Sequence, residues 1–126
     1  MPLTVTERSA AWLVRSYAPG VLQLARAERI EEARSPVLLA PDSGITALAS
    51  GSSESIAESD LSAVLTLAPE VVLLGTASGS PLGHGAAKRR LLERGIGLEV
   101  MTLGAACRTY NLLVQDGRRV AALLFP

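Results

Sequence analysis

Three short apolar runs in the second half of the chain, separated by stretches with helical spacing, restrict its fold most. The runs cover residues 71–74, 96–101 and 119–125, and the first is apolar without interruption. A continuous apolar run of this length is typical of a strand that is covered on both faces. Helices are predicted between the runs, over residues 85–94 and 105–114. This order requires crossover connections, which are right-handed in nearly all proteins, and it therefore predicts a βαβαβ unit.

The first half has a different pattern, with short runs between turn signals. Residues 11–17 and 21–25 are rich in strand formers and flank Pro19-Gly20, so they predict a hairpin. Further strands are predicted over residues 36–41 and 45–49, the first at a sheet edge because its prolines cannot donate to a ladder. These short antiparallel strands extend the main sheet or form a small layer on it. The predicted fold class is therefore an α/β sandwich with a mixed sheet.

The middle of the chain is more polar. Residues 28–34 are charged and are predicted to lie on the surface, and residues 50–59 are predicted to form a surface loop. Ser59 is predicted to cap the next helix, with Asp60 in its first turn, and Pro69 to end it. The apolar residues of this helix recur at helical spacing and predict one buried face: Leu61, Val64, Leu65 and Ala68.

Length and composition limit the class of protein. The 126 residues fit a single domain, with residues 1–10 as a loose lead-in. Twelve basic residues balance twelve acidic ones and only 3% of residues are aromatic, which argues against nucleic acid as a partner. A single cysteine suits a reducing compartment. No apolar run approaches the roughly 18 residues of a membrane span, and residues 1–11 lack a secretory signal, so a cytoplasmic protein is predicted.

Small and polar residues follow two of the predicted strands. Parallel strands end at the same edge of a sheet, where ligands bind in open α/β folds. The loops after residues 71–74 and 96–101 therefore predict a crevice at this edge. Its candidate residues are Gly75, Thr76, Met101, Thr102, Cys107, Arg108, Thr109, Tyr110 and Asn111. The alternative is that tight connections simply require small residues here.

Cys107 is placed in the first turn of its predicted helix, where the helix dipole and Arg108 could lower the pKa of its thiol. The alternative is a small buried hydrophobe, as most free cysteines are. Thr109, Tyr110 and Asn111 could contact a ligand or form a structural hydrogen-bond network. His84, the single histidine, is expected in a distant flexible loop, which leaves Cys107 without a base.

No motif assigns a reaction to the chain. One cysteine and one histidine lack the spacing of a metal site. The loop at residues 75–80 matches neither the dinucleotide-binding nor the P-loop signature, and there is no nucleophile elbow. We therefore predict no catalytic residues, no metal and no cofactor.

Residues 95–101, 105–113 and 117–123 resemble a widespread family of small domains of unknown function. Its eukaryotic members include a mitochondrial respiratory complex I assembly factor, the third in its naming series, and an adipogenesis-associated protein. The resemblance covers nearly the whole chain from Trp12 onward. It implies a compact β+α/β/α layered domain, a crevice near Gly75, and no established enzymatic activity.

One departure from the family pattern concerns the crevice. Family members commonly have Asp-Thr after the strand-ending methionine, whereas Thr102-Leu103 follow Met101 here. A role that required a carboxylate at this position is therefore not expected of this chain.

Two functional hypotheses remain at the level of the sequence. The first is a non-enzymatic binding or assembly-assisting protein with a protein partner. The second is a binder of a small, anionic molecule, or an enzyme, that uses the crevice with Cys107 or Thr109 in contact with the ligand. The missing carboxylate, the remote His84 and the lack of a cofactor motif favour the first.

Overall fold

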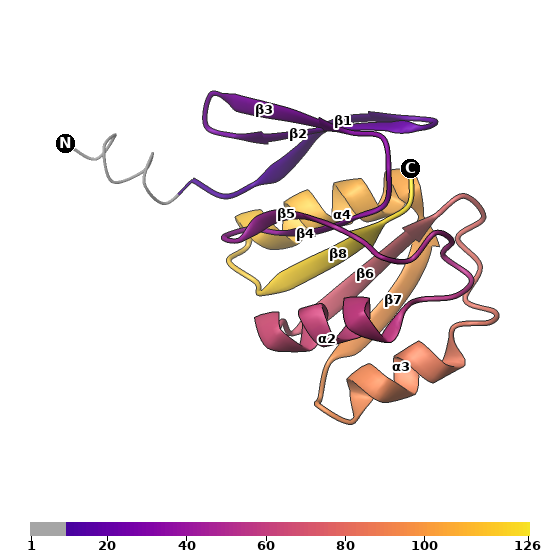
Figure 1. The fold of residues 1–126 in the computed structure, drawn as a ribbon. Helices are drawn as coiled ribbons and strands as arrows, with labels where there is room; N and C mark the ends of the chain where they lie inside the picture. The colour runs from indigo at the N-terminus through magenta and orange to yellow at the C-terminus, as the bar shows by residue number, and fades with distance from the viewer. Residues whose placement is uncertain (1–9) are drawn as a thin grey trace.

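The computed structural model describes residues 10–126 (Figure 1). Most of the predicted loose lead-in over residues 1–10 therefore lies outside the described residues. The elements follow the order β1 (Leu13–Ala18), β2 (Val21–Arg26), β3 (Arg29–Ala33), β4 (Val37–Ala40), β5 (Gly44–Ala47), α2 (Glu58–Leu67), β6 (Val71–Thr76), α3 (Gly85–Leu92), β7 (Gly97–Thr102), α4 (Leu103–Gln115) and β8 (Val120–Leu124).

The strands form two sheets. β1, β2 and β3 form an antiparallel meander, and the larger sheet has the order β5-β4-β8-β6-β7. In the larger sheet β6 pairs in parallel with β7 and β8, while β4 pairs antiparallel with β5 and β8. The predicted α/β class with a mixed sheet is therefore confirmed, and the N-terminal strands do both things that were predicted: β4 and β5 extend the main sheet, and β1 to β3 form a separate small layer.

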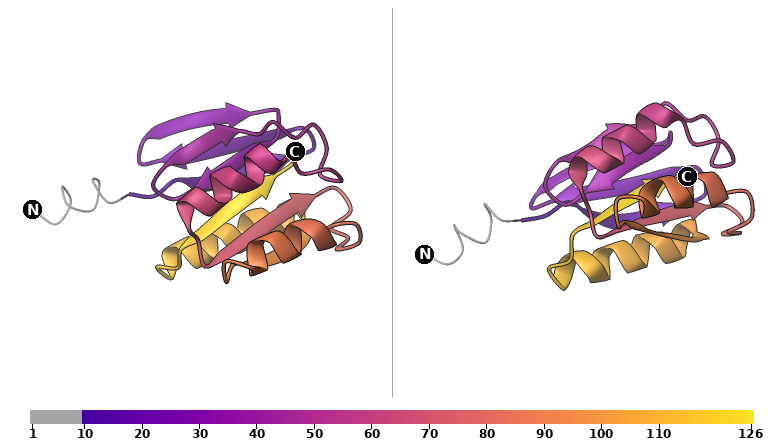
Figure 2. Two further views of the ribbon diagram at one scale, coloured as in Figure 1. Left: turned by 60° about the horizontal axis from the view of Figure 1, so that its bottom comes forward. Right: turned by 90° about the horizontal axis from the view of Figure 1, so that it is seen from below.

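Both faces of the larger sheet are covered, which explains its continuous apolar strands. Helices α2 and α3 lie on one face, and α4 and the small sheet lie on the other (Figures 1 and 2). β8 shows the consequence directly, because Val120, Ala122 and Leu124 enter one core while Ala121 and Leu123 enter the other. A strand buried on both faces has no position for a polar side chain.

One prediction for the first half is wrong, and one strand was not predicted. The charged residues 28–34 are mostly exposed, as predicted, but Arg29–Ala33 also form a strand, β3, because the chain turns at Ala27 with φ of 52° and Leu22 then pairs with Ala33. No glycine or proline marks this turn. The segment 36–41 is not at an edge, since β4 lies between β5 and β8. Its prolines stand just outside the paired residues, so they remove no hydrogen bond from the ladder.

The start of α2 also differs from the prediction. Ala57, not Ser59, occupies the N-cap, and its backbone is extended. Asp60 turns back to accept hydrogen bonds from the amides of Ala49 and Ser50, at 2.9 and 2.7 Å, and from the Ser50 hydroxyl. The Ser50 oxygen accepts in turn from the Ala57 amide at 2.8 Å. A buried network thus replaces a local cap and fixes where the helix begins.

Candidate functional site

A crevice of about 560 Å³ opens where β6, β7 and β8 end. This is the sheet edge at which the sequence predicts one. Three walls come from the loop after β6, the start of α4 and the residues after β8, and the fourth comes from the β1–β2 turn. The lining residues are mostly apolar or small: Tyr17, Ala18, Pro19, Gly20, Thr76, Ala77, Thr102, Leu103, Gly104, Phe125 and Pro126.

Gly75 lies behind the crevice wall and lets α4 approach β6. A Cβ atom at Gly75 would lie 2.8 Å from the Cβ of Ala106 and 3.3 Å from the Cα of Leu103. Real Cβ atoms do not come this close to their neighbours, so only glycine fits without movement of the helix. The position of the α4 N-terminus at the crevice therefore depends on this residue.

The two crevice threonines use their hydroxyl groups on the backbone. Thr76 Oγ1 accepts a hydrogen bond from the Gly79 amide at 2.8 Å. Thr102 Oγ1 accepts from the Ala105 amide at 3.4 Å and so caps α4. Gly79, with φ of 70°, packs against the backbone of Thr102. Thr76 thus fixes the loop after β6, Thr102 caps α4, and the two segments meet where Gly79 packs against Thr102.

Tyr17 forms a wall of the crevice that the sequence analysis missed. A Cβ atom at Gly104 would lie 2.8 Å from the Tyr17 ring, so the ring rests directly on the start of α4. Arg108 donates a hydrogen bond to the Tyr17 hydroxyl oxygen, and its guanidinium lies 6.0 Å from the ring centre. The Pro19-Gly20 turn was visible in the sequence, but nothing local indicated that it would meet α4.

Tyr110 and Asn111 do not line the crevice; they join α4 to β1. The buried Tyr110 hydroxyl donates to the Trp12 carbonyl at 2.8 Å. The Asn111 side chain accepts from the Val14 amide and donates to the Val14 carbonyl, both at 2.8 Å. Burial, together with the charge of Asp42, raises the pKa of Tyr110, which keeps the phenol protonated. These contacts form a structural network, one of the two alternatives for these residues.

The structure favours the second alternative for Cys107, a small buried hydrophobe. The helix begins at Leu103, two residues earlier than predicted, so Cys107 lies in the second turn, and its side chain packs in the core at 1% exposure. Burial raises the pKa of its thiol to about 11, although the charge of Arg108 opposes this. His84 is also not in an open loop, because it is buried at the N-cap of α3, on the other face of the sheet.

Three further candidates are not among the residues that line the crevice. Met101 and Thr109 are half-buried, and Arg108 is exposed. Thr76 and Thr102 are therefore the predicted residues that the fold brings to the crevice surface.

Neither a metal site nor a membrane-spanning helix is found among the described residues 10–126. These residues contain no group of three or more His, Cys, Asp or Glu side chains that could hold a metal ion. None of the helices in this part of the chain has the length and apolar character needed to cross a membrane.

The family described as "Protein of unknown function (DUF498/DUF598)" matches residues 14–125, which include all strands except Leu13 of β1 and the crevice lining except Pro126. The chain belongs to this family. The resemblance predicted from the residues around Cys107 is thereby confirmed.

Known relatives include proteins with quite different names. The chain is 32% identical over 71 residues to the "13 kDa major membrane protein" of Francisella tularensis subsp. holarctica (strain LVS), covering 56% of this chain and 58% of that one. It is 33% identical over 78 residues to the rat (Rattus norvegicus) "NADH dehydrogenase (ubiquinone) 1 alpha subcomplex assembly factor 3", covering 60% and 42%. The chain thus spans about half the length of these curated relatives.

A solved structure shares the fold. The crystal structure of a Bordetella parapertussis protein superposes with a TM-score of 0.79 at 32% identity and covers 93% of this chain and 97% of that chain. The two-sheet arrangement is therefore common to this chain and a relative of nearly the same length.

Proposed function

We propose that this domain is a non-enzymatic, cytoplasmic binding protein that assists the assembly of a protein complex by holding an apolar segment of a partner in the crevice. Its main support is the crevice lining, in which Tyr17 is the one ionisable side chain among the described residues. General acid–base catalysis mostly uses His, Asp, Glu, Lys or Cys within hydrogen-bond reach of the substrate, and the Tyr17 hydroxyl already accepts a hydrogen bond from Arg108. Apolar walls suit an apolar anchor side chain instead.

The exposed aromatic surface of the crevice also favours a segment of a partner protein as its occupant. Tyr17 is 40% exposed although it is a large aromatic residue, so it presents unburied apolar surface at the rim. Pro19 and Phe125 stand in the neighbouring walls. Aromatic residues in a concave surface are typical centres of protein–protein contact. A partner that inserts one apolar side chain would cover this surface.

One relative supports the assembly part of the proposal. The rat protein that matches 60% of this chain is named an assembly factor, although the chain covers only 42% of its length. A role in assembly needs binding surfaces and no chemistry, which agrees with the crevice lining.

Site-specific photo-crosslinking in native lysate tests the proposal. A photoreactive amino acid at Ala18 in the crevice is expected to capture one defined protein, identified by mass spectrometry, while the same probe at Glu31 in β3 is not. Tyr17→Ser should abolish the capture. Ile30→Ser is the matched control, because Ile30 is another exposed large residue, at 49%, and lies in β3. Equal capture from both positions, or capture that survives Tyr17→Ser, would refute the proposal.

A small anionic ligand is the second candidate function. The N-terminus of α4 meets the crevice at Leu103 and Gly104, and helix N-termini favour anions. The volume of about 560 Å³ also lies in the range of small-molecule sites, roughly 300–1,000 Å³. A panel of phosphate and carboxylate compounds would then raise the melting temperature, and Tyr17→Ser, which removes a wall of the crevice, would remove the shift. Absence of any shift across the panel would exclude this candidate.

A further inference from the structure

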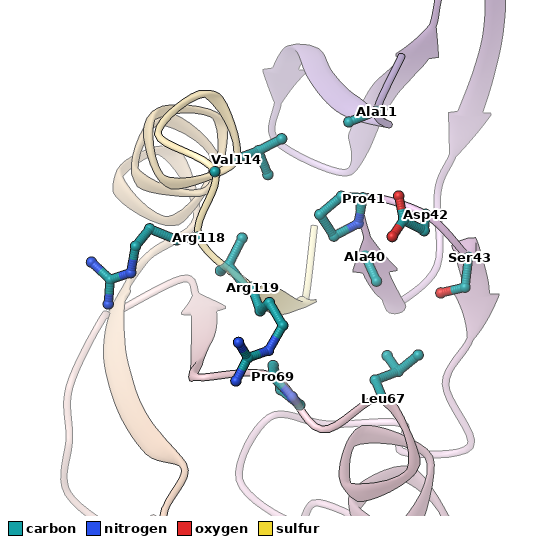
Figure 3. A pocket seen from close by; sticks show the side chains of 12 residues that line it. Ala11, Ala40, Pro41, Asp42, Ser43, Leu67, Pro69, Val114, Arg118 and Arg119 are labelled. Atoms are coloured by element: carbon teal, nitrogen blue, oxygen red, sulfur yellow. The ribbon is translucent and has the colours of Figure 1, made fainter. Parts of the chain in front are cut away.

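A groove crosses the opposite edge of the larger sheet, where β6 and β8 begin. It consists of two hollows that share Pro69, Arg118 and Arg119. The smaller, of about 360 Å³, lies between the end of α4 and the β4–β5 turn (Figure 3). The larger, of about 570 Å³, lies between the end of α2 and the α3–β7 connection. The two hollows therefore adjoin at Pro69, Arg118 and Arg119, and together they are called the groove below.

The two halves of the groove differ in character. Leu67, Pro69 and Val114 give the smaller hollow apolar walls. The larger hollow is lined by Arg94, Arg118 and Arg119. A ligand that fills the whole groove must accordingly combine an apolar group with negative charge.

The larger hollow has an excess of positive charge. Glu70 is the only carboxylate among its described lining residues, against three guanidinium groups, which leaves an excess of two positive charges. Glu70 is already engaged, because it accepts hydrogen bonds from the Arg119 amide at 2.9 Å and from Arg118 Nε at 3.4 Å. The chain as a whole is neutral, so this excess is a local feature.

The C-terminal end of α2 accounts for the position of Arg119, but it does not account for Arg94 and Arg118. Helix C-termini attract cations, and Arg119 Nε reaches the Ala68 carbonyl at the end of α2, at 3.5 Å. The Arg118 side chain nevertheless remains 49% exposed beside Glu70, and Arg94 is exposed. At least two guanidinium groups are thus available to an external anion.

We propose that this groove binds an acidic segment of a protein partner, with an apolar side chain in the smaller hollow and carboxylates on Arg94 and Arg118. The orientation follows from Asp42, which lies across the smaller hollow from Arg118 and Arg119 and repels a carboxylate there (Figure 3). A nucleic acid offers no apolar side chain for the smaller hollow, and a flat bilayer surface does not reach into a concave groove. This surface is separate from the crevice and does not depend on the function proposed above.

Fluorescence anisotropy with a labelled peptide tests the proposal on the full chain. The probe peptide carries one leucine followed by four alternating aspartates and glutamates. We expect binding at low ionic strength that weakens as salt is added. The double variant Arg94→Gln/Arg118→Gln should raise the Kd about fivefold, as expected for two exposed charge pairs. A peptide with serine in place of leucine should also bind more weakly.

Matched controls separate this surface from general charge effects. Arg15→Gln/Lys88→Gln removes the same charge from exposed positions outside the groove and should leave the Kd within about twofold. Tyr17→Ser should not change it either, which distinguishes the groove from the crevice. The proposal is overturned if the double variant binds like the wild type, or if the peptide does not bind. It is also overturned if phosphatidylglycerol vesicles or an oligonucleotide bind more tightly through the same arginines.

Discussion

Tyr110 is the residue whose hydroxyl joins α4 to the small sheet. Its removal by Tyr110→Phe leaves the Trp12 carbonyl without its donor at a buried position. An unsatisfied buried acceptor costs about 1–3 kcal/mol, so we expect a loss of about 1–2 kcal/mol in the free energy of unfolding. Urea denaturation measures it as a lower midpoint with an unchanged m value.

Tyr17→Phe provides the control for Tyr110. Tyr17 is 40% exposed, so water can replace the hydrogen bond from Arg108. We expect the unfolding free energy to fall by less than about 0.5 kcal/mol. Equal losses in the two variants would show that burial does not decide the contribution of these hydroxyls.

Asp60 makes stability depend on pH. Burial by itself raises the pKa of this carboxyl, but hydrogen bonds from the Ser50 hydroxyl and from the amides of Ala49 and Ser50 outweigh it, so the pKa is lowered from 3.8. A lowered folded-state pKa stabilises the protein above the unfolded value and loses that contribution as pH falls through the folded value. Asp60→Asn should cost about 1–3 kcal/mol at pH 7, and the difference from wild type should shrink below about pH 4.

The measurement for Asp60 is urea denaturation at a series of pH values. Glu58→Gln is the control, because the Glu58 side chain is 64% exposed in its pair with Arg90 and should contribute little. A constant difference between Asp60→Asn and wild type down to pH 2 would contradict the assignment.

At the scale of elements, the contact between α4 and β6 depends on the absence of a side chain at Gly75. Gly75→Ala brings a methyl group to 2.8 Å from the Ala106 Cβ, so the helix must move. We expect a loss of about 2 kcal/mol, as for other overpacked sites. Gly97→Ala is the matched control in β7, since its Cβ would meet nothing within 4 Å. Gly97→Ala should be neutral or slightly stabilising. Thermal unfolding of both variants measures the difference as a lower melting temperature for Gly75→Ala only.

The order of elements along the chain could be read from sequence better than their exact ends. The continuous apolar run at residues 71–74 identified β6, since only a strand covered on both faces tolerates it. β3 was missed because its turn uses Ala27 at φ of 52° instead of glycine or proline. Ser59 was misread as a cap because the helix already begins at Glu58, and Asp60 bonds to Ala49 and Ser50, eleven and ten positions earlier.

For the whole molecule, α4 makes the two sheets share one core. Trp12 and Leu24 of the small-sheet region are buried in the same cluster as Leu73 and Leu124 of the larger sheet. We therefore expect a single cooperative unfolding transition, as for one domain. Trp12, the single tryptophan, packs against Gly44 of β5, so its fluorescence reports on the contact between the two sheets, and far-UV circular dichroism reports on the helices. An earlier transition of the fluorescence signal would show that the small sheet unfolds separately.

The sequence by itself determined the α/β class, the alternation of strands and helices in the second half, and the edge at which a crevice forms. Each of these follows from hydrophobic periodicity and turn residues, which act over a few positions. The family could also be recognised from residues 95–123, because several unusual residues occur there in order.

Only the tertiary structure decided what the individual side chains do. Tyr110 and Asn111 bond to Trp12 and Val14, which lie 98 and 97 positions away in the chain. Cys107 could be an activated thiol or a buried hydrophobe by sequence, and the packing of α4 against the sheets buries it. Contacts between segments so far apart depend on how the small sheet packs on α4, and no local pattern records that packing.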